Sequence, residues 1–437
     1  MEDLWYQLPP LAQDALLLVG LLLPVLLIAA IVLRGYAPGP LIGALLRRFR
    51  WANLVFVLLI ALSVGMSIGL IAQERGLRIG MAQAADKFDL VVAAPGSEMT
   101  MLLAAVFLQP SDVPLLSGAT YTAIATHENV EIAAPLAFGD SYKGSSVVGT
   151  IADFATYLSD DRITGHLWTD PFEAVAGAAA PVALGDTFTP AHGHGAAAEQ
   201  GAHEGVRFTV VGKMARTGTP WDTAILIPIE AVWMVHGLAN GHPLSAGDQI
   251  GPPFDPDLFP GTPAIVVHTS ALWANYALKS EFSRDNETMA FFPGTVLANL
   301  YRIMGDVRQA MSVMSGLTQV LVAASVLLGL SILTRLFQRQ TAMLRALGAP
   351  RRFVIAVIWS YGVTLLAAGT ALGLGLGLGA ATLLSWLVTH RTDVLVQASL
   401  GWNEVHLAAA FLAITSLLSL LPALVLLRQP ITNGLRA

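Results

Sequence analysis

The stretch WANLVFVLLIALSVGMSIGLIA, residues 51–72, contains no charged side chain and is long enough to cross a lipid bilayer as a helix. Four more stretches share both properties. With 54% hydrophobic and only 12% charged residues, the composition lies outside the range of soluble domains. The sequence therefore predicts an integral membrane protein with five spanning helices, the other four being Ala15–Leu33, Gln309–Thr334, Phe353–Val388 and Val405–Leu427.

Charged residues are distributed unevenly between the segments that join these stretches. Residues 34–50, 335–352 and 428–437 hold 11 arginines and no acidic residue, whereas residues 74–308 hold 25 acidic and 12 basic residues. Cytoplasmic loops of membrane proteins carry an excess of Lys and Arg. We therefore expect these three arginine-bearing segments and the C-terminus in the cytoplasm, and the N-terminus outside. The acidic exterior argues against a nucleic-acid partner.

The order of these segments divides the chain into four parts. They are a first transmembrane helix (1–34), a cytoplasmic amphipathic segment with the second helix (35–73), an exported α+β domain (74–308), and three closing helices (309–437). Both ends of the exported domain read as helical stalks continuous with the neighbouring spans. The stalks are Glu74–Lys87 and Pro293–Met311; expected strands are Asp89–Ala93, Glu131–Ala134, Ser146–Thr150, Phe208–Val211, Ala224–Ile227 and Ala264–His268; expected helices are Met99–Leu108, Ile151–Leu158, Glu230–His236 and Ser270–Phe282.

The cytoplasmic segment Thr334–Arg352 reads TRLFQRQTAMLRALGAPRR and is basic and amphipathic. Small apolar residues recur at helical spacing, while arginines lie elsewhere on the helical wheel. A glycine and a proline then end the predicted helix. From periodicity alone, such a segment could simply lie on anionic lipid headgroups. The apolar face consists of Ala342, Met343, Ala346 and Leu347; the terminating residues are Gly348 and Pro350.

The fourth spanning stretch is longer than a bilayer requires, so we expect it to tilt, kink or project from the membrane. It contains two interleaved pairs of glycines that permit close approach of a neighbouring helix, either within this chain or in a second copy. The glycines are Gly373, Gly375, Gly377 and Gly379.

Three histidines share the segment HGHGAAAEQGAH: His192, His194 and His203. Neutral imidazoles at such spacing could close around zinc, with nearby glutamates adding oxygen ligands. A solvated loop and a weak metal-binding or pH-sensing loop are the alternatives. His236 and His242 could join the site if the fold brings them near, although we expect His236 to be partly buried on an amphipathic helix.

Several classes of chemistry are excluded by what the sequence lacks. There is no cysteine, so disulfides and thiolate chemistry are absent. There is no G-x-S-x-G, no H-E-x-x-H and no intramembrane carboxylate pair. Without a G-x-x-x-x-G-K-[ST] motif, the chain has no P-loop to hold ATP. We therefore predict a non-catalytic membrane subunit.

The segment LRALGAPRR, residues 344–352, closely resembles the one that follows the third-from-last helix in FtsX/MacB/LolC-type permeases of ABC transporters. The resemblance extends to LLRRFRWANLVFVLLI, residues 45–60, and to a large exported domain followed by three helices. The segment FDLVVAAPGS, residues 88–97, is similar to a bacterial subgroup of this family. The first helix, Ala15–Leu33, is additional to the four that are usual in the family.

The resemblance implies a permease that couples ATP hydrolysis by a partner subunit to movement of periplasmic domains. It implies two ATPase subunits, which hold ATP and Mg²⁺, a second permease copy in a homodimer, and the bacterial inner membrane; a periplasmic adaptor or substrate-binding protein could join them. Lipoprotein release, zinc-linked transport and activation of a periplasmic hydrolase are alternatives. The resemblance assigns ATPase coupling to Arg339, Gln340, Met343, Leu344, Arg345, Ala346, Leu347, Gly348, Arg351 and Arg352.

Overall fold

The computed structural model describes residues 7–109, 111–193, 205–247, 249–284, 286–336, 338–392 and 396–428. The chain forms two compact units. We call them the helical unit, which comprises Met1–Gly76, Gly305–Ser385 and Gln397–Ala437, and the sheet unit, which comprises Leu77–Met304 and Trp386–Val396.

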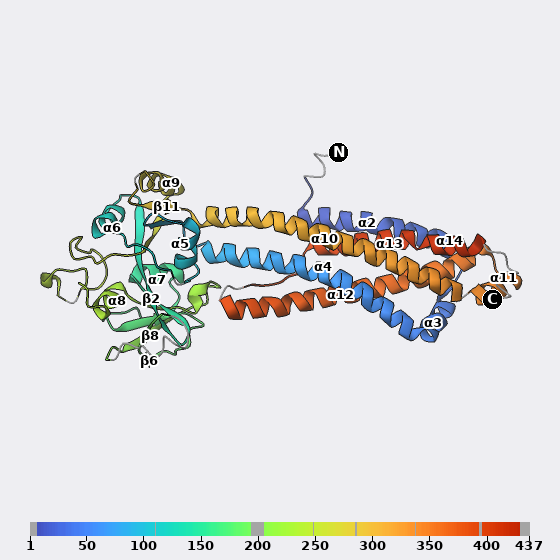
Figure 1. The fold of residues 1–437 in the computed structure, drawn as a ribbon, viewed down its shortest axis with the longest axis horizontal. Helices are drawn as coiled ribbons and strands as arrows, with labels where there is room; N and C mark the ends of the chain where they lie inside the picture. The colour runs from blue at the N-terminus through green and yellow to red at the C-terminus, as the bar shows by residue number, and fades with distance from the viewer. Residues whose placement is uncertain are drawn as a thin grey trace. The chain divides into compact units, whose positions relative to one another are not determined.

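The helical unit is built from long apolar helices (Figure 1). In the described residues, four helical segments are long and apolar enough to cross a membrane: Pro10–Leu33, Arg50–Ala85, Arg351–His390 and Trp402–Val425. The chain is therefore a multi-pass membrane protein. Its helices are α2 (Pro10–Leu33), α3 (Gly39–Arg48), α4 (Arg50–Ala85), α10 (Pro293–Leu336), α11 (Gln338–Ala346), α12 (Arg351–Thr392), α13 (Trp402–Leu418) and α14 (Leu420–Arg428).

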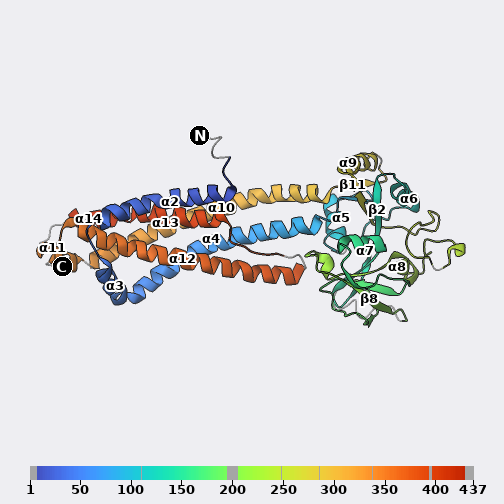
Figure 2. The ribbon, with the colours of Figure 1, turned by 180° about the vertical axis from the view of Figure 1, so that it is seen from behind.

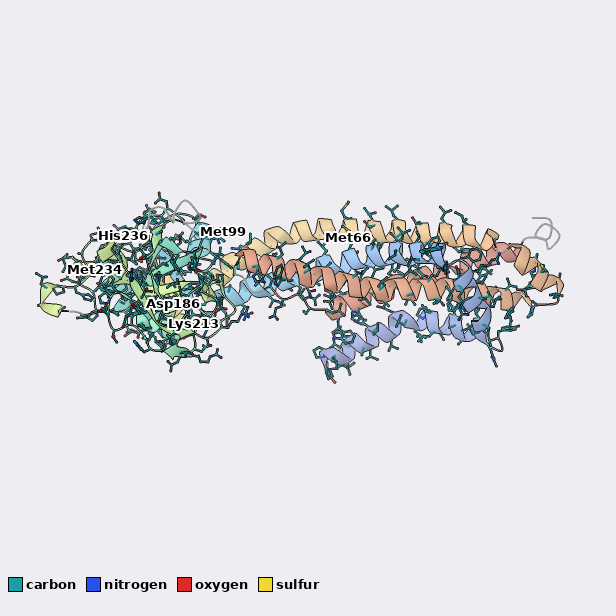
Figure 3. All side chains as sticks on the ribbon, turned by 90° about the horizontal axis from the view of Figure 1, so that it is seen from below. Met66, Met99, Asp186, Lys213, Met234 and His236 are labelled. Atoms are coloured by element: carbon teal, nitrogen blue, oxygen red, sulfur yellow. The ribbon has the colours of Figure 1, made fainter. Side chains whose placement is uncertain are left out.

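The core of the helical unit lies where α4, α10, α12 and α13 meet. Ile60, Val326, Tyr361 and Phe411, one from each helix, are buried together there. Large apolar side chains also point outward, as Met66 does from α4 with 77% of its surface exposed (Figure 3). Such a surface suits contact with lipid, because water would penalise so much exposed apolar area.

The additional first helix, α2, lies alongside α13 (Figure 2). Val25 of α2 is buried in a small cluster with Trp359 of α12 and Ala413 of α13. Near its start, the carbonyl oxygen of Asp14 lies 2.9 Å from Nε2 of His406 on α13. These contacts make α2 part of the helical unit.

The sheet unit contains one mixed sheet of 11 strands. Its main path runs β11-β1-β10-β2-β3-β9-β5-β8-β4, while β6 pairs with β8 and β7 pairs with β2. The β3–β9 and β5–β8 pairs are parallel and the others are antiparallel. The strands are β1 (Leu90–Ala93), β2 (Val130–Tyr142), β3 (Ser145–Thr150), β4 (Ile163–Gly165), β5 (Glu173–Ala176), β6 (Thr187–Phe188), β7 (Ala191–His192), β8 (Phe208–Met214), β9 (Ile225–Pro228), β10 (Ala264–Thr269) and β11 (Met289–Phe291).

Short helices cover this sheet and complete its hydrophobic core. Two of them begin at serine N-caps, where Ser97 Oγ and Ser117 Oγ each accept a hydrogen bond from a backbone N–H three residues later. Aromatic side chains such as Phe154 and Trp221 lie fully buried between helices and sheet. The helices are α5 (Glu98–Ala105), α6 (Gly118–Ala125), α7 (Ala152–Leu158), α8 (Ile229–Val235) and α9 (Leu272–Glu281), with 3₁₀ turns at Pro220–Asp222 and Leu244–Ala246.

The six strands and four helices expected inside the exported domain are all present, with shifted ends. The structure adds α6 and the five strands β4, β5, β6, β7 and β11. These strands have two to four residues each, too few for a periodic pattern. Both expected stalks lie within long helices: α4 runs unbroken to Ala85, and α10 runs unbroken from Pro293.

Candidate functional site

The residues singled out for ATPase coupling lie in α11, in the turn after it and at the start of α12. Gly348 ends the helix with a φ of +95°, a conformation that glycine adopts without steric cost. The backbone N–H of Ala349 donates to the carbonyl of Leu344 over 2.9 Å, and that of Gly348 donates to the carbonyl of Arg345 over 3.1 Å. This pair of bonds is a Schellman motif, which satisfies carbonyl groups at a helix end.

The turn presents apolar side chains at the surface of the helical unit. Leu347 is 84% exposed and Met343 is 53% exposed. Of the expected apolar face, only Ala342 is buried, while Ala346 is exposed with the other two. Leu344 and Arg345 are half-buried, and Arg351 and Arg352 are exposed. The structure does not describe the side chains of Arg339 and Gln340.

The four glycines of α12 that were predicted to permit helix packing divide into two pairs. A Cβ added to Gly373 would lie 2.8 Å from Cβ of Val64, and one added to Gly377 would lie 2.6 Å from the carbonyl oxygen of Gly65. These two glycines therefore permit close approach of α12 to α4 within the chain. Gly375 and Gly379 would meet no described atom within 4 Å.

A charged pair inside the helical unit was not expected from the sequence. Arg75 of α4 forms an ion pair with Glu404 of α13, whose side chain is fully buried. Both residues lie just beyond the ends of uncharged stretches, and 329 positions separate them along the chain, so no local pattern pairs them.

In the sheet unit, His192 lies beside Asp140 and His236. One potential ligand atom from each residue lies within 4.8 Å of the other two. The expectation that His236 is partly buried is wrong, because it caps the C-terminus of α8 and is exposed. His194 and His203 lie outside the described residues. Asp140 was not predicted from the sequence, because its approach to His192 depends on strand pairing.

His242 and Glu230 form a second histidine–carboxylate pair, which is buried in the sheet unit. Nε2 of His242 lies 3.4 Å from Oε1 of Glu230, and each side chain has at most 2% of its surface exposed. Burial raises the pKa of Glu230, since a carboxylate loses hydration there. His242 does not join His192 in the cluster that could hold a metal ion.

Comparison with known protein families finds a match in the C-terminal part of the chain. Residues 312–431 match the family model described as FtsX-like permease C-terminal. This match confirms the resemblance to FtsX-type permeases that the sequence predicts. No curated protein sequence matches the chain.

Two solved structures resemble part of the fold. The periplasmic region of MacB from Actinobacillus actinomycetemcomitans is 11% identical, with a TM-score of 0.31; the alignment covers 49% of this chain and 95% of that one. The extracellular domain of the noncanonic ABC-type transporter YknZ from Gram-positive bacteria is 10% identical, with a TM-score of 0.27. That alignment covers 46% of this chain and 98% of the YknZ domain. TM-scores of this size carry no functional conclusion.

Proposed function

We propose that this chain is the membrane subunit of an ABC transporter of the FtsX/MacB/LolC type, driven by a separate ATPase subunit. The observation that carries the proposal is the turn at Leu347 and Gly348. It presents an exposed apolar side chain within the region that matches the FtsX-like permease family. Exposed apolar side chains such as Leu347 and Met343, on and beside a turn held by its own backbone hydrogen bonds, suit contact with a groove of a partner protein.

In this proposal, α11 and its turn are the contact with the ATPase. Leu347 enters the ATPase groove, and the backbone at Gly348 keeps the approach close. The guanidinium groups of Arg345, Arg351 and Arg352 surround this contact with positive charge, and Arg339 and Gln340 extend it along α11. Met343, Leu344 and Ala346 complete the apolar contact.

The work of the transporter is then mechanical. ATP binding draws the cytoplasmic segments of two permease copies together, and α4 and α10 carry the displacement toward the exported domains. Supporting this, α4 has 36 residues and α10 has 44, each in one uninterrupted helix. A continuous helix transmits displacement, whereas a flexible linker absorbs it.

The proposed arrangement in the membrane has five spanning helices. The fifth is α10, which holds the apolar stretch Gly316–Gly329. The N-terminus and residues 74–308 lie on the periplasmic side of a bacterial inner membrane, and the C-terminus lies in the cytoplasm. The functional assembly contains two copies of this chain and two ATPase subunits, which bind ATP and Mg²⁺. Lipoprotein release and control of a periplasmic hydrolase stay alternatives for the task performed outside.

The test uses the full-length chain, purified with its ATPase from membranes and reconstituted in nanodiscs. Leu347→Asp places a charge at the apolar contact, so we expect loss of ATPase co-purification and of the permease-stimulated hydrolysis of ATP. The double variant Leu347→Asp, Gly348→Pro should lose the ATPase in the same way, while the chain itself stays inserted in the membrane. The matched control is Leu272→Asp, because Leu272 of α9 is also an exposed leucine, at 74%.

Two results would contradict the proposal. One is full ATPase stimulation by the Leu347→Asp, Gly348→Pro double variant. The other is loss of ATPase from the Leu272→Asp control to the same extent, which would mean that any added surface charge disturbs the complex. If α11 only rests on lipid headgroups, Leu347→Asp will loosen its membrane contact and leave ATP hydrolysis unchanged.

A further inference from the structure

We propose that Asp140, His192 and His236 form a binding site for a divalent transition-metal ion in the sheet unit. The three residues come from three different elements: β2, β7 and the end of α8. Their potential ligand atoms all lie within 4.8 Å of one another. Two ligands of a tetrahedral zinc ion lie roughly 3.3 Å apart, since each is about 2.0–2.1 Å from the metal. A small movement of the side chains therefore closes the site.

Strand register fixes the first two ligands. Asp140 of β2 and His192 of β7 are directly opposite each other in an antiparallel pair. Oδ1 of Asp140 already lies 3.0 Å from Nδ1 of His192. The backbone N–H of Gly193 donates to the carbonyl of Gly139 over 2.8 Å, which holds the two strands together next to this pair. The separation of these ligands is thus set by the backbone.

The third ligand is oriented by a hydrogen bond to the backbone. Nδ1 of His236 lies 2.7 Å from the carbonyl oxygen of Val232, one turn earlier in α8. A carbonyl oxygen can only accept, so in this contact Nδ1 carries the proton and the lone pair of the neutral ring is on Nε2. Metal-binding histidines are commonly held in this way, with one ring nitrogen donating to a carbonyl and the other facing the metal.

Burial distinguishes this cluster from an ordinary surface ion pair. Asp140 has only 5% of its surface exposed, whereas both histidines are exposed. Removing a carboxylate from water is costly unless positive charge lies close to it, and a divalent cation supplies more charge than one imidazolium. The exposed imidazoles leave a route by which the ion can reach the carboxylate.

The other histidine–carboxylate contacts of the sheet unit lack this arrangement. Nδ1 of His268 lies 2.6 Å from Asp89 and Nε2 lies 3.7 Å from Glu131, so its carboxylates flank opposite sides of the ring. The pair of His242 and Glu230 has two members and is sealed from solvent. In the part of the chain that the structure describes, the cluster at Asp140 is the one whose donor atoms converge.

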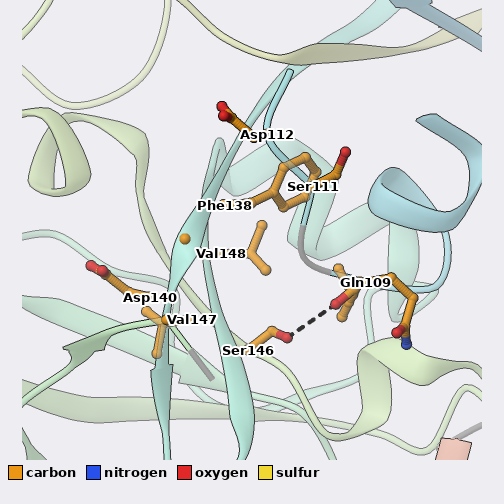
Figure 4. Close-up of a pocket in the computed structure, with 11 residues that line it drawn as sticks. Gln109, Ser111, Asp112, Phe138, Asp140, Ser146, Val147 and Val148 are labelled. Atoms are coloured by element: carbon orange, nitrogen blue, oxygen red, sulfur yellow. Dashed lines mark hydrogen bonds between the residues drawn. The ribbon is translucent and has the colours of Figure 1, made fainter. Parts of the chain in front are cut away.

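Two imidazole nitrogens and one carboxylate oxygen favour zinc, nickel, copper or ferrous iron over calcium and magnesium, which prefer oxygen ligands alone. Three protein ligands leave a coordination position for water or another molecule. Asp140 and Gly193 also line a cavity of about 390 Å³, seen in close-up in Figure 4.

Zinc binding to the full-length protein tests the site. The chain is stripped with a chelator, returned to nanodiscs and titrated with Zn²⁺ by calorimetry against a competing chelator. We expect His236→Ala and Asp140→Asn each to weaken binding at the tight site by about 100-fold or more, because each removes a ligand. X-ray absorption of the wild-type zinc complex should show nitrogen and oxygen neighbours at about 2.0–2.1 Å.

The matched control is His166→Ala, since His166 is an exposed histidine of the sheet unit outside the cluster. It should bind zinc as tightly as the wild type. His236→Ala removes an exposed side chain, so it decides the question even if Asp140→Asn fails to fold. Unchanged zinc affinity in the His236→Ala protein would overturn the proposal. Equal weakening by His166→Ala would show that zinc is held by scattered surface histidines, which also overturns it.

Discussion

Arg75 and Glu404 form an ion pair within the helical unit, and the side chain of Glu404 has no exposed surface. A buried charge that loses its partner keeps the cost of its lost hydration. Arg75→Met should therefore lower the free energy of unfolding by about 3–5 kcal/mol. Reversible unfolding in mixed micelles measures this change.

The control for this pair is a double-mutant cycle. Glu404→Gln keeps an acceptor for the backbone N–H of Gly401, which lies 3.1 Å from Oε2 of Glu404. The double variant Arg75→Met, Glu404→Gln should be more stable than Arg75→Met alone, since no unpaired charge is left inside. Additive losses in the two single variants would contradict a direct interaction.

Close contact between α4 and α12 predicts opposite effects for neighbouring glycines. Gly377→Ala would place a methyl group 2.6 Å from the carbonyl oxygen of Gly65, so the helices must separate. We expect a loss of about 1–3 kcal/mol, as for other overpacked contacts. Gly375→Ala is the matched control, because it meets no described atom within 4 Å and gains helix propensity. Equal unfolding free energies for the two variants would refute this packing.

The turn after α11 depends on a backbone conformation that suits glycine. At a φ of +95°, Gly348→Ala should cost about 1 kcal/mol or shift the turn, and so displace Leu347. Permease-stimulated ATP hydrolysis is the measurement, and we expect it to fall. Gly316→Ala, within α10, should leave it unchanged, because the added methyl group would meet no described atom within 4 Å. A Gly348→Ala protein with normal stimulation would show that the turn geometry does not matter for coupling.

Buried Glu230 predicts a pH dependence of stability. Burial raises its pKa above the ordinary value of 4.5, and hydrogen bonds from backbone N–H groups and His242 offset this only in part. The folded state therefore holds the proton more tightly than the unfolded state. Its stabilising contribution is complete below pH 4.5 and is lost as the pH rises through the raised pKa.

Glu230→Gln should remove this part of the pH dependence, because the amide resembles the protonated acid. Thermal unfolding of the full chain between about pH 4 and pH 8 checks it. The control is Glu281→Gln, since the Glu281 side chain is 58% exposed. If wild type and Glu230→Gln lose stability in parallel across that range, burial of Glu230 is not the cause.

Periodicity and charge were sufficient to predict most of the fold. The uncharged stretches become long helices, and runs such as Ser146–Thr150 and Ala264–His268 become strands, because burial of alternate or continuous apolar residues is a local signal. The predicted number of five spanning helices is confirmed only in part. Among the described residues, four helices are long and apolar enough to cross a membrane, and the role of α10 as a fifth stays a prediction.

The candidate sites were harder to predict because they depend on pairing between distant residues. His192 was found from its histidine-rich neighbourhood, but Asp140 lies 52 positions earlier and becomes its neighbour only through the β2–β7 register. Arg75 and Glu404 likewise meet through helix packing. By contrast, the glycine and proline after α11 are a local signal, and they indicated its end correctly.

The single helix α4 serves two hydrophobic cores, with Ile60 and Val64 in one and Ala84 in the other. Each residue of an α-helix advances the direction of the next side chain by about 100°. One inserted or deleted residue between Val64 and Ala84 would therefore change the angle between these two apolar faces around the axis of α4 by about 100°. A length change of a whole number of helical turns would preserve that angle.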